Sequence, residues 1–295
     1  MKISEILQKR SYSFSFEFFP PKTSDGFIQL FQTIENLKKC NPSYVSVTFG
    51  AGGSTRAKTI ELVGRIKHEI GLESMAHLTC VGSGRDEIKT FLEELESNKI
   101  ENVLALRGDP PQGQDTFIKP EGGFQYANEL VAFIKQNYSF CIGVAGYPEG
   151  HTECPEKSKD LENLKKKVDA GADFIITQLF FDNNAYFEFM DRVLALGINV
   201  PVIPGIMPIV NFKQVKRFTK MCGATIPDGL MKRLEKVQDD LSKVAEIGLD
   251  HANEQCEQLL NNGAPGIHFY TLNKSIATIR ILEHLQKTVN LADHS

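Results

Sequence analysis

Several features that would assign a function directly are missing from this 295-residue sequence. The six cysteines are scattered, with no C-x-x-C pair, and no histidine cluster has the spacing of zinc ligands. No stretch reaches the roughly 18 apolar residues that cross a membrane, and the charged N-terminal segment has no apolar signal core. We therefore expect a cytoplasmic protein with reduced thiols and no bound metal.

Strong charge and obvious domain boundaries are missing as well. A formal net charge of -4 gives no broad electrostatic reason to bind nucleic acid or an anionic membrane. No Pro/Gly/Ser linker or low-complexity tract interrupts the chain. We expect one domain over residues 1–295.

Phosphate-binding motifs are also absent. The segment Gly82–Glu87 lacks the third glycine of G-x-G-x-x-G, and no Walker lysine motif occurs. We interpret this segment as a turn followed by a helix cap. The run Lys165-Lys166-Lys167 is, by default, the solvated face of a helix.

The sequence does contain a regular alternation of short β-branched or aromatic runs with longer amphipathic stretches, which is typical of βαβ units. Eight such runs are predicted as strands: Phe14–Phe19, Tyr44–Phe49, Ser74–Cys80, Asn102–Arg107, Cys141–Tyr147, Phe174–Phe180, Val200–Met207 and Gly266–Leu272.

Eight strand-helix units in this length favour a closed (β/α)8 barrel over an open doubly wound sheet, which the pattern alone leaves possible. The first barrel helix is predicted to begin at Thr23 or Ser24. About sixty residues between the seventh and eighth strands leave room for two or three extra helices. One of these is predicted from about Leu241 to Asn262, ending at Gly263. A last helix is predicted from Ser275 to about Leu285.

Glu17 stands out in the first predicted strand. Alternation places Phe14, Phe16 and Phe18 on one face, which suits the surrounding helices, and turns Glu17 into the barrel. Burial there should raise its pKa and make it a proton donor near neutral pH. The alternative is an inward glutamate that is only ion-paired with a barrel arginine such as Arg107.

Two further strand ends carry polar residues. Arg107 and Asp109 flank Gly108, which would let a ligand approach the backbone closely, although a structural salt bridge would also explain Arg107. Gln178 is an uncharged hydrogen-bonding residue in an apolar strand and suits recognition of a heterocycle. His77 and Thr48 are weaker candidates.

Taken together, several motifs in this order resemble the 5,10-methylenetetrahydrofolate reductase family over about residues 13–285. They are Ser15-Phe16-Glu17-Phe18-Phe19-Pro20-Pro21-Lys22, Val45-Ser46-Val47-Thr48, Ala76-His77-Leu78-Thr79-Cys80, Leu104-Ala105-Leu106-Arg107-Gly108-Asp109, Lys167-Val168-Asp169-Ala170-Gly171-Ala172, Pro204-Gly205-Ile206-Met207-Pro208 and His268-Phe269-Tyr270-Thr271-Leu272-Asn273.

The resemblance implies a (β/α)8 enzyme that binds FAD, takes hydride from NADH or NADPH and then reduces methylenetetrahydrofolate. By similarity, Glu17 would be the general acid that opens the five-membered folate ring. Asp109 would bind the pterin ring and bias the flavin electronics, and Gln178 would contact the pterin. Gln214 and Phe218, one helical turn apart, would contact folate or nicotinamide, although sequence alone makes Phe218 a core residue.

The remaining positions that match the family line its FAD site. They are Thr48, His77, Leu106, Arg107, Gly108, Asp109, Tyr126, Ala127, Ala145, Tyr147, His151, Asp160, Asn163, Lys166 and Lys167. The resemblance gives the lysine run a purpose, since cationic side chains can neutralise a pyrophosphate without a glycine motif.

One residue departs from the family pattern. Lys274 replaces the usual arginine after Thr-Leu-Asn, so a two-pronged contact to the folate tail would become a point-charge contact. We also expect no C-terminal regulatory domain and, by analogy, a homo-oligomer. The competing interpretations are a Schiff-base aldolase or metal-dependent hydrolase on the same fold, and a non-catalytic folate or flavin binder.

Overall fold

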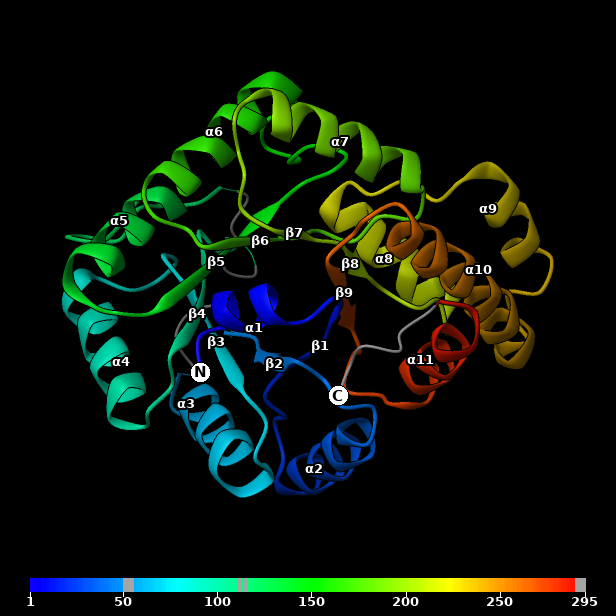
Figure 1. Cartoon of the computed structure of the whole chain (residues 1–295), viewed down its shortest axis with the longest axis horizontal. Coiled ribbons are helices and arrows are strands. Elements are labelled where there is room, and N and C mark those ends of the chain that lie inside the picture. Colours follow the sequence, from blue (N-terminus) through cyan, green and yellow to red (C-terminus); the bar gives the residue numbers. More distant parts are fainter. Residues whose placement is uncertain (50–55, 111–112, 114–115, 290–295) are drawn as a thin grey trace.

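The computed structural model describes residues 1–49, 56–110, 113 and 116–289. Within these residues, parallel strands follow one another in the order β7-β6-β5-β4-β3-β2-β1-β9-β8, and helices surround them (Figure 1). The strands are β1 (Ser13–Phe18), β2 (Tyr44–Val47), β3 (Ser74–Thr79), β4 (Asn102–Leu106), β5 (Cys141–Gly146), β6 (Phe174–Thr177), β7 (Val202–Ile203), β8 (Gly205–Ile206) and β9 (Gly266–Tyr270).

The helices precede, separate and follow these strands in the chain. They are α1 (Ile3–Lys9), α2 (Ser24–Lys38), α3 (Arg56–Arg65) with a π-helical extension (Ile66–Ile70), α4 (Arg85–Ser97), α5 (Ala127–Asn137), α6 (Lys157–Asp169), α7 (Asn183–Ala195), α8 (Phe212–Cys222), α9 (Asp228–Glu235), α10 (Leu241–Asn261) and α11 (Ile276–Thr288). None of the described helices is both long enough and apolar enough to cross a membrane.

The predicted (β/α)8 barrel is confirmed, with one difference in the seventh strand. The run Val200–Met207 is broken at Pro204 into β7, which pairs with β6, and β8, which pairs with β9. Proline has no N–H to donate to a ladder. Its carbonyl still accepts a hydrogen bond from the His268 N–H at 2.9 Å. The two pieces therefore act as one barrel strand that closes the ring.

The helix boundaries follow the predicted signals. Thr23 caps α2, since its hydroxyl accepts the Gly26 N–H at 3.2 Å. Helix α10 ends at Asn261, just before Gly263 in a left-handed conformation (φ +86°). Three helices, α8, α9 and α10, fill the interval before the last strand, as the spacing predicted.

Alternation in β1 separates two environments. Phe14, Phe16 and Phe18 pack into the apolar layer between the strands and the helices. Ser15 and Glu17 point into the barrel, where they meet residues of β3 and β9. The predicted orientation of both faces is confirmed.

Helix α1 closes the amino-terminal end of the barrel (Figure 1). Ile3 is fully buried in an interior apolar cluster together with strand residues including Phe174. The Ile3 N–H donates to Asn102 Oδ1 at 2.8 Å, and the Ser4 N–H contacts Cys141 Sγ at 3.3 Å. Since Asn102 and Cys141 begin β4 and β5, the carboxyl ends of the strands are left for a binding site.

Candidate active site

The Glu17 carboxylate lies inside the barrel near the carboxyl end of β1. Its Oε2 is 3.5 Å from His77 Nε2 and 3.6 Å from His268 Nε2. The side chain of Glu17 is 20% exposed, whereas His268 is fully buried and His77 is 6% exposed. One edge of the carboxylate thus remains accessible between two buried imidazoles.

Ser15 orients the second imidazole. Its Oγ is 2.8 Å from His268 Nδ1, deep in the barrel. A hydroxyl that donates to Nδ1 leaves the ring proton on Nε2, the nitrogen that faces Glu17. His268 of β9 therefore lies between Ser15 and Glu17 of β1, and Ser15 and His268 are register partners in the two paired strands.

The predicted rise in the pKa of Glu17 is wrong. Burial alone would raise this pKa, but the His268 imidazole, whose Nε2 faces the carboxylate at 3.6 Å, and the electrostatic effect of His77 and His268 hold it below its usual range. The sequence showed the burial but not the two histidines. Burial lowers the pKa of His77 to about 4, partly opposed by Glu17, so this imidazole is neutral at pH 7.

Tyr270 forms the adjoining wall. Its hydroxyl donates to the Thr177 carbonyl at 2.6 Å, and its ring packs edge-on against His268 with centroids 5.3 Å apart. The hydrogen bond between Tyr270 and Thr177 leaves no room for a side chain at Gly205. A Cβ at this position would lie 2.3 Å from the Thr177 carbonyl oxygen and 2.8 Å from the Tyr270 hydroxyl oxygen. Glycine is thus required where the split seventh strand passes Tyr270.

Arg107 lies at the end of β4 and does not contact Glu17. Its Nη1 donates to Glu153 Oε2 at 2.7 Å, and its Nη2 donates to the other carboxylate oxygen, which raises the pKa of the guanidinium. The alternative in which Glu17 is simply the partner of Arg107 is therefore wrong. Glu153 comes from the loop after β5, 46 residues away in the chain.

Gly108 is required for packing, and the close approach of a ligand to its backbone stays a prediction. Its φ is +85°, a conformation that disfavours side chains. A Cβ at this position would lie 2.7 Å from Val81 Cγ1 and 3.0 Å from Thr79 Cβ. The missing side chain thus lets the end of β4 turn against the segment that follows β3.

A second polar cluster follows β5. The Lys167 ammonium donates to the Ala145 carbonyl at 2.6 Å and lies 6.0 Å from the centre of the Tyr147 ring. The His151 N–H donates to Asp160 Oδ2 at 3.3 Å, and its ring packs edge-on against Tyr147 at 4.6 Å. Burial lowers the pKa of Lys167 to about 8, although Asp160 partly restores it.

The three consecutive lysines of α6 point in different directions. Only Lys167 turns toward the barrel, whereas Lys165 pairs with Asp169 and Lys166 donates to Asn163 Oδ1 at 3.3 Å on the exposed surface. Lys166 and Asn163 point to solvent in this arrangement, and the cofactor-binding role assigned to them stays a prediction.

Other predicted cofactor residues lie at the same end of the barrel. Thr48, Leu106 and Ala145 lie at or just beyond the carboxyl ends of β2, β4 and β5, and Tyr126 and Ala127 begin α5. Asp109 is exposed after β4. Thr79 Oγ1, which sequence analysis did not select, is buried at the end of β3 and has no hydrogen-bond partner among the described residues.

The predicted substrate residues are distributed over three elements. Gln178 turns its Oε1 toward the Leu179 N–H at 2.9 Å, which leaves its amide nitrogen available. Gln214 and Phe218 are partly buried on α8, and Phe218 packs with Tyr270 in one apolar cluster. Lys274 is exposed beyond β9.

Besides Thr79, sequence analysis missed four residues of this site, Ser15, His268, Tyr270 and Glu153. The first three alternate inward on β1 and β9, so the same period-2 argument that selected Glu17 could have found them. Glu153 lies in an irregular loop where no periodic signal exists.

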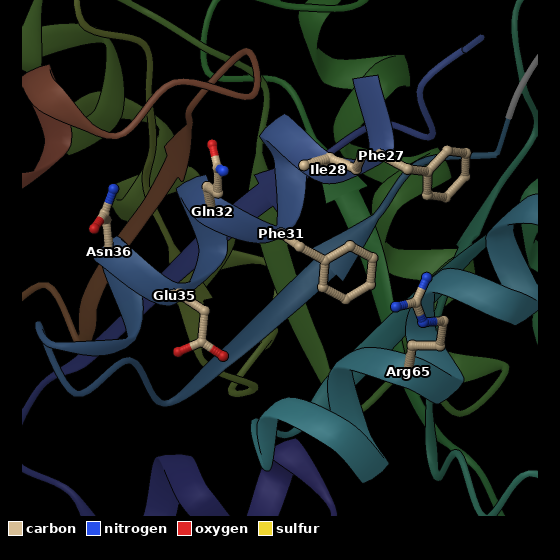
Figure 2. A pocket seen from close by; sticks show the side chains of 7 residues that line it. All are labelled: Phe27, Ile28, Phe31, Gln32, Glu35, Asn36 and Arg65. Carbon is tan, nitrogen blue, oxygen red and sulfur yellow. The ribbon is translucent and has the colours of Figure 1, made fainter. Parts of the chain in front are cut away.

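A larger groove, about 580 Å³ in volume, lies between α2 and α3 on the outer surface of the barrel (Figure 2). Phe27, Ile28 and Phe31 line it, and the Arg65 guanidinium lies 4.1 Å from the centre of the Phe31 ring. Arg65 also pairs with Glu69, and the residues that line the groove belong to α2 and α3. The convergent polar groups are at the carboxyl end of the barrel.

Known proteins match this chain over most of its length. The family model described as methylenetetrahydrofolate reductase matches residues 2–286. "Methylenetetrahydrofolate reductase (NADH) 1" of Arabidopsis thaliana is 44% identical over 295 residues, covering 96% of this chain and 50% of the relative. The chain thus spans about half the length of that relative. "5,10-Methylenetetrahydrofolate reductase" of Escherichia coli (strain K12) is 42% identical over 261 residues, covering 88% of this chain and 86% of the relative.

Solved structures share the fold at low sequence identity. A protein from Clostridium thermocellum, described as binding two copies of 5-methyl-5,6,7,8-tetrahydrofolic acid, has a TM-score of 0.63 at 17% identity and covers 97% of this chain and 99% of its own. An aldo-keto reductase from Klebsiella pneumoniae in complex with NADPH has a TM-score of 0.53 at 11% identity, covering 94% of this chain and 85% of its own. Both similarities support the barrel alone.

Proposed function

The chain belongs to the methylenetetrahydrofolate reductase family, and on this premise we propose that it reduces 5,10-methylenetetrahydrofolate to 5-methyltetrahydrofolate, with FAD as cofactor and NADH or NADPH as hydride donor. The observation that carries the proposal is the Glu17 carboxylate, held between two buried imidazoles with one edge exposed at the carboxyl end of the barrel. The name of the Arabidopsis thaliana relative favours NADH as the donor.

The residues after β3, β4 and β5 fit a flavin nucleotide. Lys167 and Arg107 supply positive charge for a pyrophosphate, and the unpartnered Thr79 hydroxyl supplies a buried polar contact. Tyr147 and His151 add aromatic surface. When bound, the flavin would supply the hydride chemistry, accepting hydride from the nicotinamide and passing it to the folate in a ping-pong sequence.

Glu17 would supply the proton that opens the five-membered ring of the substrate, by protonating the ring nitrogen that leaves. In the free protein the two imidazoles hold its pKa low against the effect of burial, while one edge of the carboxylate still meets water. A substrate that covers this edge removes the remaining water, and such desolvation favours the protonated acid. The surrounding residues thus hold Glu17 in place, and substrate binding converts it into a donor.

Ser15 and His268 would keep this donor in position. The imidazole that faces Glu17 can donate a hydrogen bond to the carboxylate formed after proton transfer. Gln178, with its amide nitrogen free, would bind an acceptor on the pterin edge, and Asp109 would bind a donor. Gln214 and Phe218 on α8 would contact folate or nicotinamide, with Lys274 near the folate tail.

The six free cysteines support a location in the reducing cytoplasm. A homo-oligomer, one catalytic domain over residues 1–295 and a folate-tail role for Lys274 all remain predictions.

A direct experiment tests the proposed reaction. The purified protein is incubated with FAD, freed of excess cofactor and recorded in the visible range, then mixed anaerobically with NADH and finally with methylenetetrahydrofolate. We expect flavin absorbance that NADH bleaches and the folate restores. The absence of flavin uptake would contradict the proposal, as would a bleached flavin that the folate leaves unchanged.

A further inference from the structure

Glu149 joins two segments that are far apart in the chain. It lies in the β5–α6 loop, which also carries Tyr147 and His151. Both of its carboxylate oxygens accept the Thr225 N–H, at 3.1 and 3.0 Å. Thr225 follows Gly223, the left-handed residue that ends α8. The carboxylate thus fastens the end of α8 to the proposed cofactor loop.

The packing around this contact is close. A Cβ at Gly223 would lie 2.8 Å from Thr152 Cγ2, so the end of α8 lies directly on the loop. Cys222 lines a cavity of only about 10 Å³ with Tyr147 and Gln178. That volume holds about one water molecule. The end of α8 is therefore seated against the wall of the site.

Helix α8 extends this contact along one face. Gln214, Phe218 and Cys222 are four residues apart, so they project from the same side of the helix, and all three are partly buried. Phe218 and Cys222 pack in the same apolar cluster as Tyr270, which contacts His268. Any shift of the end of α8 would move this stripe relative to the centre of the site.

We propose that Glu149 is a positioning residue that holds the Gln214–Phe218–Cys222 face of α8 against the β5–α6 loop, and so couples cofactor binding at the loop to substrate binding at the helix. The coupling rests on the proposed function, because it assigns the flavin to the loop and the folate to α8. The fastening of the end of α8 by Glu149 does not depend on the proposed function.

Cys222 reports on the fastening without any enzyme assay. In a protein carrying Cys40→Ser and Cys154→Ser, which removes the two other partly exposed thiols, the rate of alkylation at Cys222 is followed by peptide mass spectrometry. Glu149→Ala should raise this rate about tenfold, the factor expected for loss of a hydrogen bond to a charged group. Glu149→Gln, which keeps one acceptor oxygen, should stay within about threefold of the parent.

Glu156→Ala is the matched control, since Glu156 lies in the same loop and its side chain accepts a local hydrogen bond from Ser158 Oγ at 2.7 Å. This control should leave the Cys222 rate unchanged. Equal rates in Glu149→Ala and Glu156→Ala would overturn the fastening, whether or not flavin binds to the protein.

Flavin addition then tests the coupling. FAD should slow Cys222 alkylation in the parent and lose that effect in Glu149→Ala, while the Kd for FAD changes by less than about threefold and the KM for the folate rises about tenfold. Undiminished protection by FAD in Glu149→Ala would overturn the coupling. A parent protein that binds no FAD would instead contradict the proposed function, and the alkylation rates without flavin would still decide the fastening.

Discussion

The two ends of the barrel interior are built from the same strands but contain different residues. At the amino-terminal end, Tyr44, Phe174 and Ile176 pack with Ile3 of α1 in an apolar cluster. At the carboxyl end, Glu17, His77 and His268 meet instead, with polar atoms that are incompletely paired. A buried polar group without a good partner lowers the free energy of unfolding. The carboxyl end therefore destabilises the fold, and the apolar packing at the amino-terminal end compensates for this loss.

This difference assigns separate roles along single strands. In β6, Phe174 belongs to the apolar end, while Gln178 follows the strand at the polar end. Substitutions at the first end should act on stability, and substitutions at the second should act on binding and chemistry.

The largest effect is expected at the apolar end, from Phe174→Ala. Phe174 is fully buried and packs edge-on against Tyr44 with centroids 6.4 Å apart. Its truncation should cost about 3–5 kcal/mol of unfolding free energy. Urea denaturation measures the loss, and Ile28→Ala, at a 60% exposed position, should cost less than about 0.5 kcal/mol. A loss of turnover per folded molecule without a loss of stability would break the division between the two ends.

Glu17→Gln tests the polar end. The variant should keep FAD and bleach normally with NADH but reduce the folate about 10²–10³ times more slowly, because its amide cannot donate the proton that the acid supplies. Stopped-flow absorbance separates the two half-reactions. Glu35→Gln, at an exposed site in the outer groove, is the control. Folate reduction at the parent rate in Glu17→Gln would reject the acid role.

Lys167→Met sharpens the comparison within the polar end. Loss of the charge should weaken FAD binding by about 10- to 100-fold, in line with a charge-assisted hydrogen bond. Lys166→Met, on the exposed side of the same helix, should change the Kd by less than about twofold. Fluorescence titration of FAD gives both constants, and equal effects of the two substitutions would contradict the orientation of α6.

The smallest effect is expected on the free energy of unfolding at acidic pH, through the titration of His77. Because the pKa of His77 falls from 6.5 to about 4 on folding, the unfolded chain binds more protons between these values, and stability is lost as the pH falls through this window. The parent should lose about 2 kcal/mol between pH 7.5 and 5 from this residue. His77→Asn should remove that part of the loss, whereas His68→Asn, at the surface, should not. Urea midpoints at both pH values decide the matter.

The main features of the barrel could be predicted from the sequence because each strand and helix has a local signal. The eight strand positions, the Thr23 cap and the end of α10 depend on neighbours within a few residues. The position of α1 inside the amino-terminal end could not be predicted, since it depends on the shape of a cavity formed by six strands. The division of the seventh strand into β7 and β8 could not be predicted either, because it depends on the pairing of β7 with β6 and of β8 with β9.

The site shows the same limit. Alternation correctly turned Glu17 inward, but the direction of its pKa depended on His77 and His268, which come from other strands. Arg107 and Glu153 meet across 46 residues, one of them in a loop without a pattern. The local sequence predicted which residues face inward. Their contact partners could not be predicted locally, because these come from other strands and loops that meet only in the closed barrel.

The break at Pro204 leaves a weakly paired junction in the barrel, the β6–β7 and β8–β9 ladders, which we call the seam. Along the seventh strand, β7 and β8 each contribute two residues, and each binds only one neighbour, so the barrel is closed there by its shortest ladders. Native-state hydrogen exchange should therefore show amides beside this seam exchanging through local opening, while amides at the β3–β4 junction, paired over five residues, wait for global unfolding. The seam also borders the site, because Gly205 and Tyr270 lie on it.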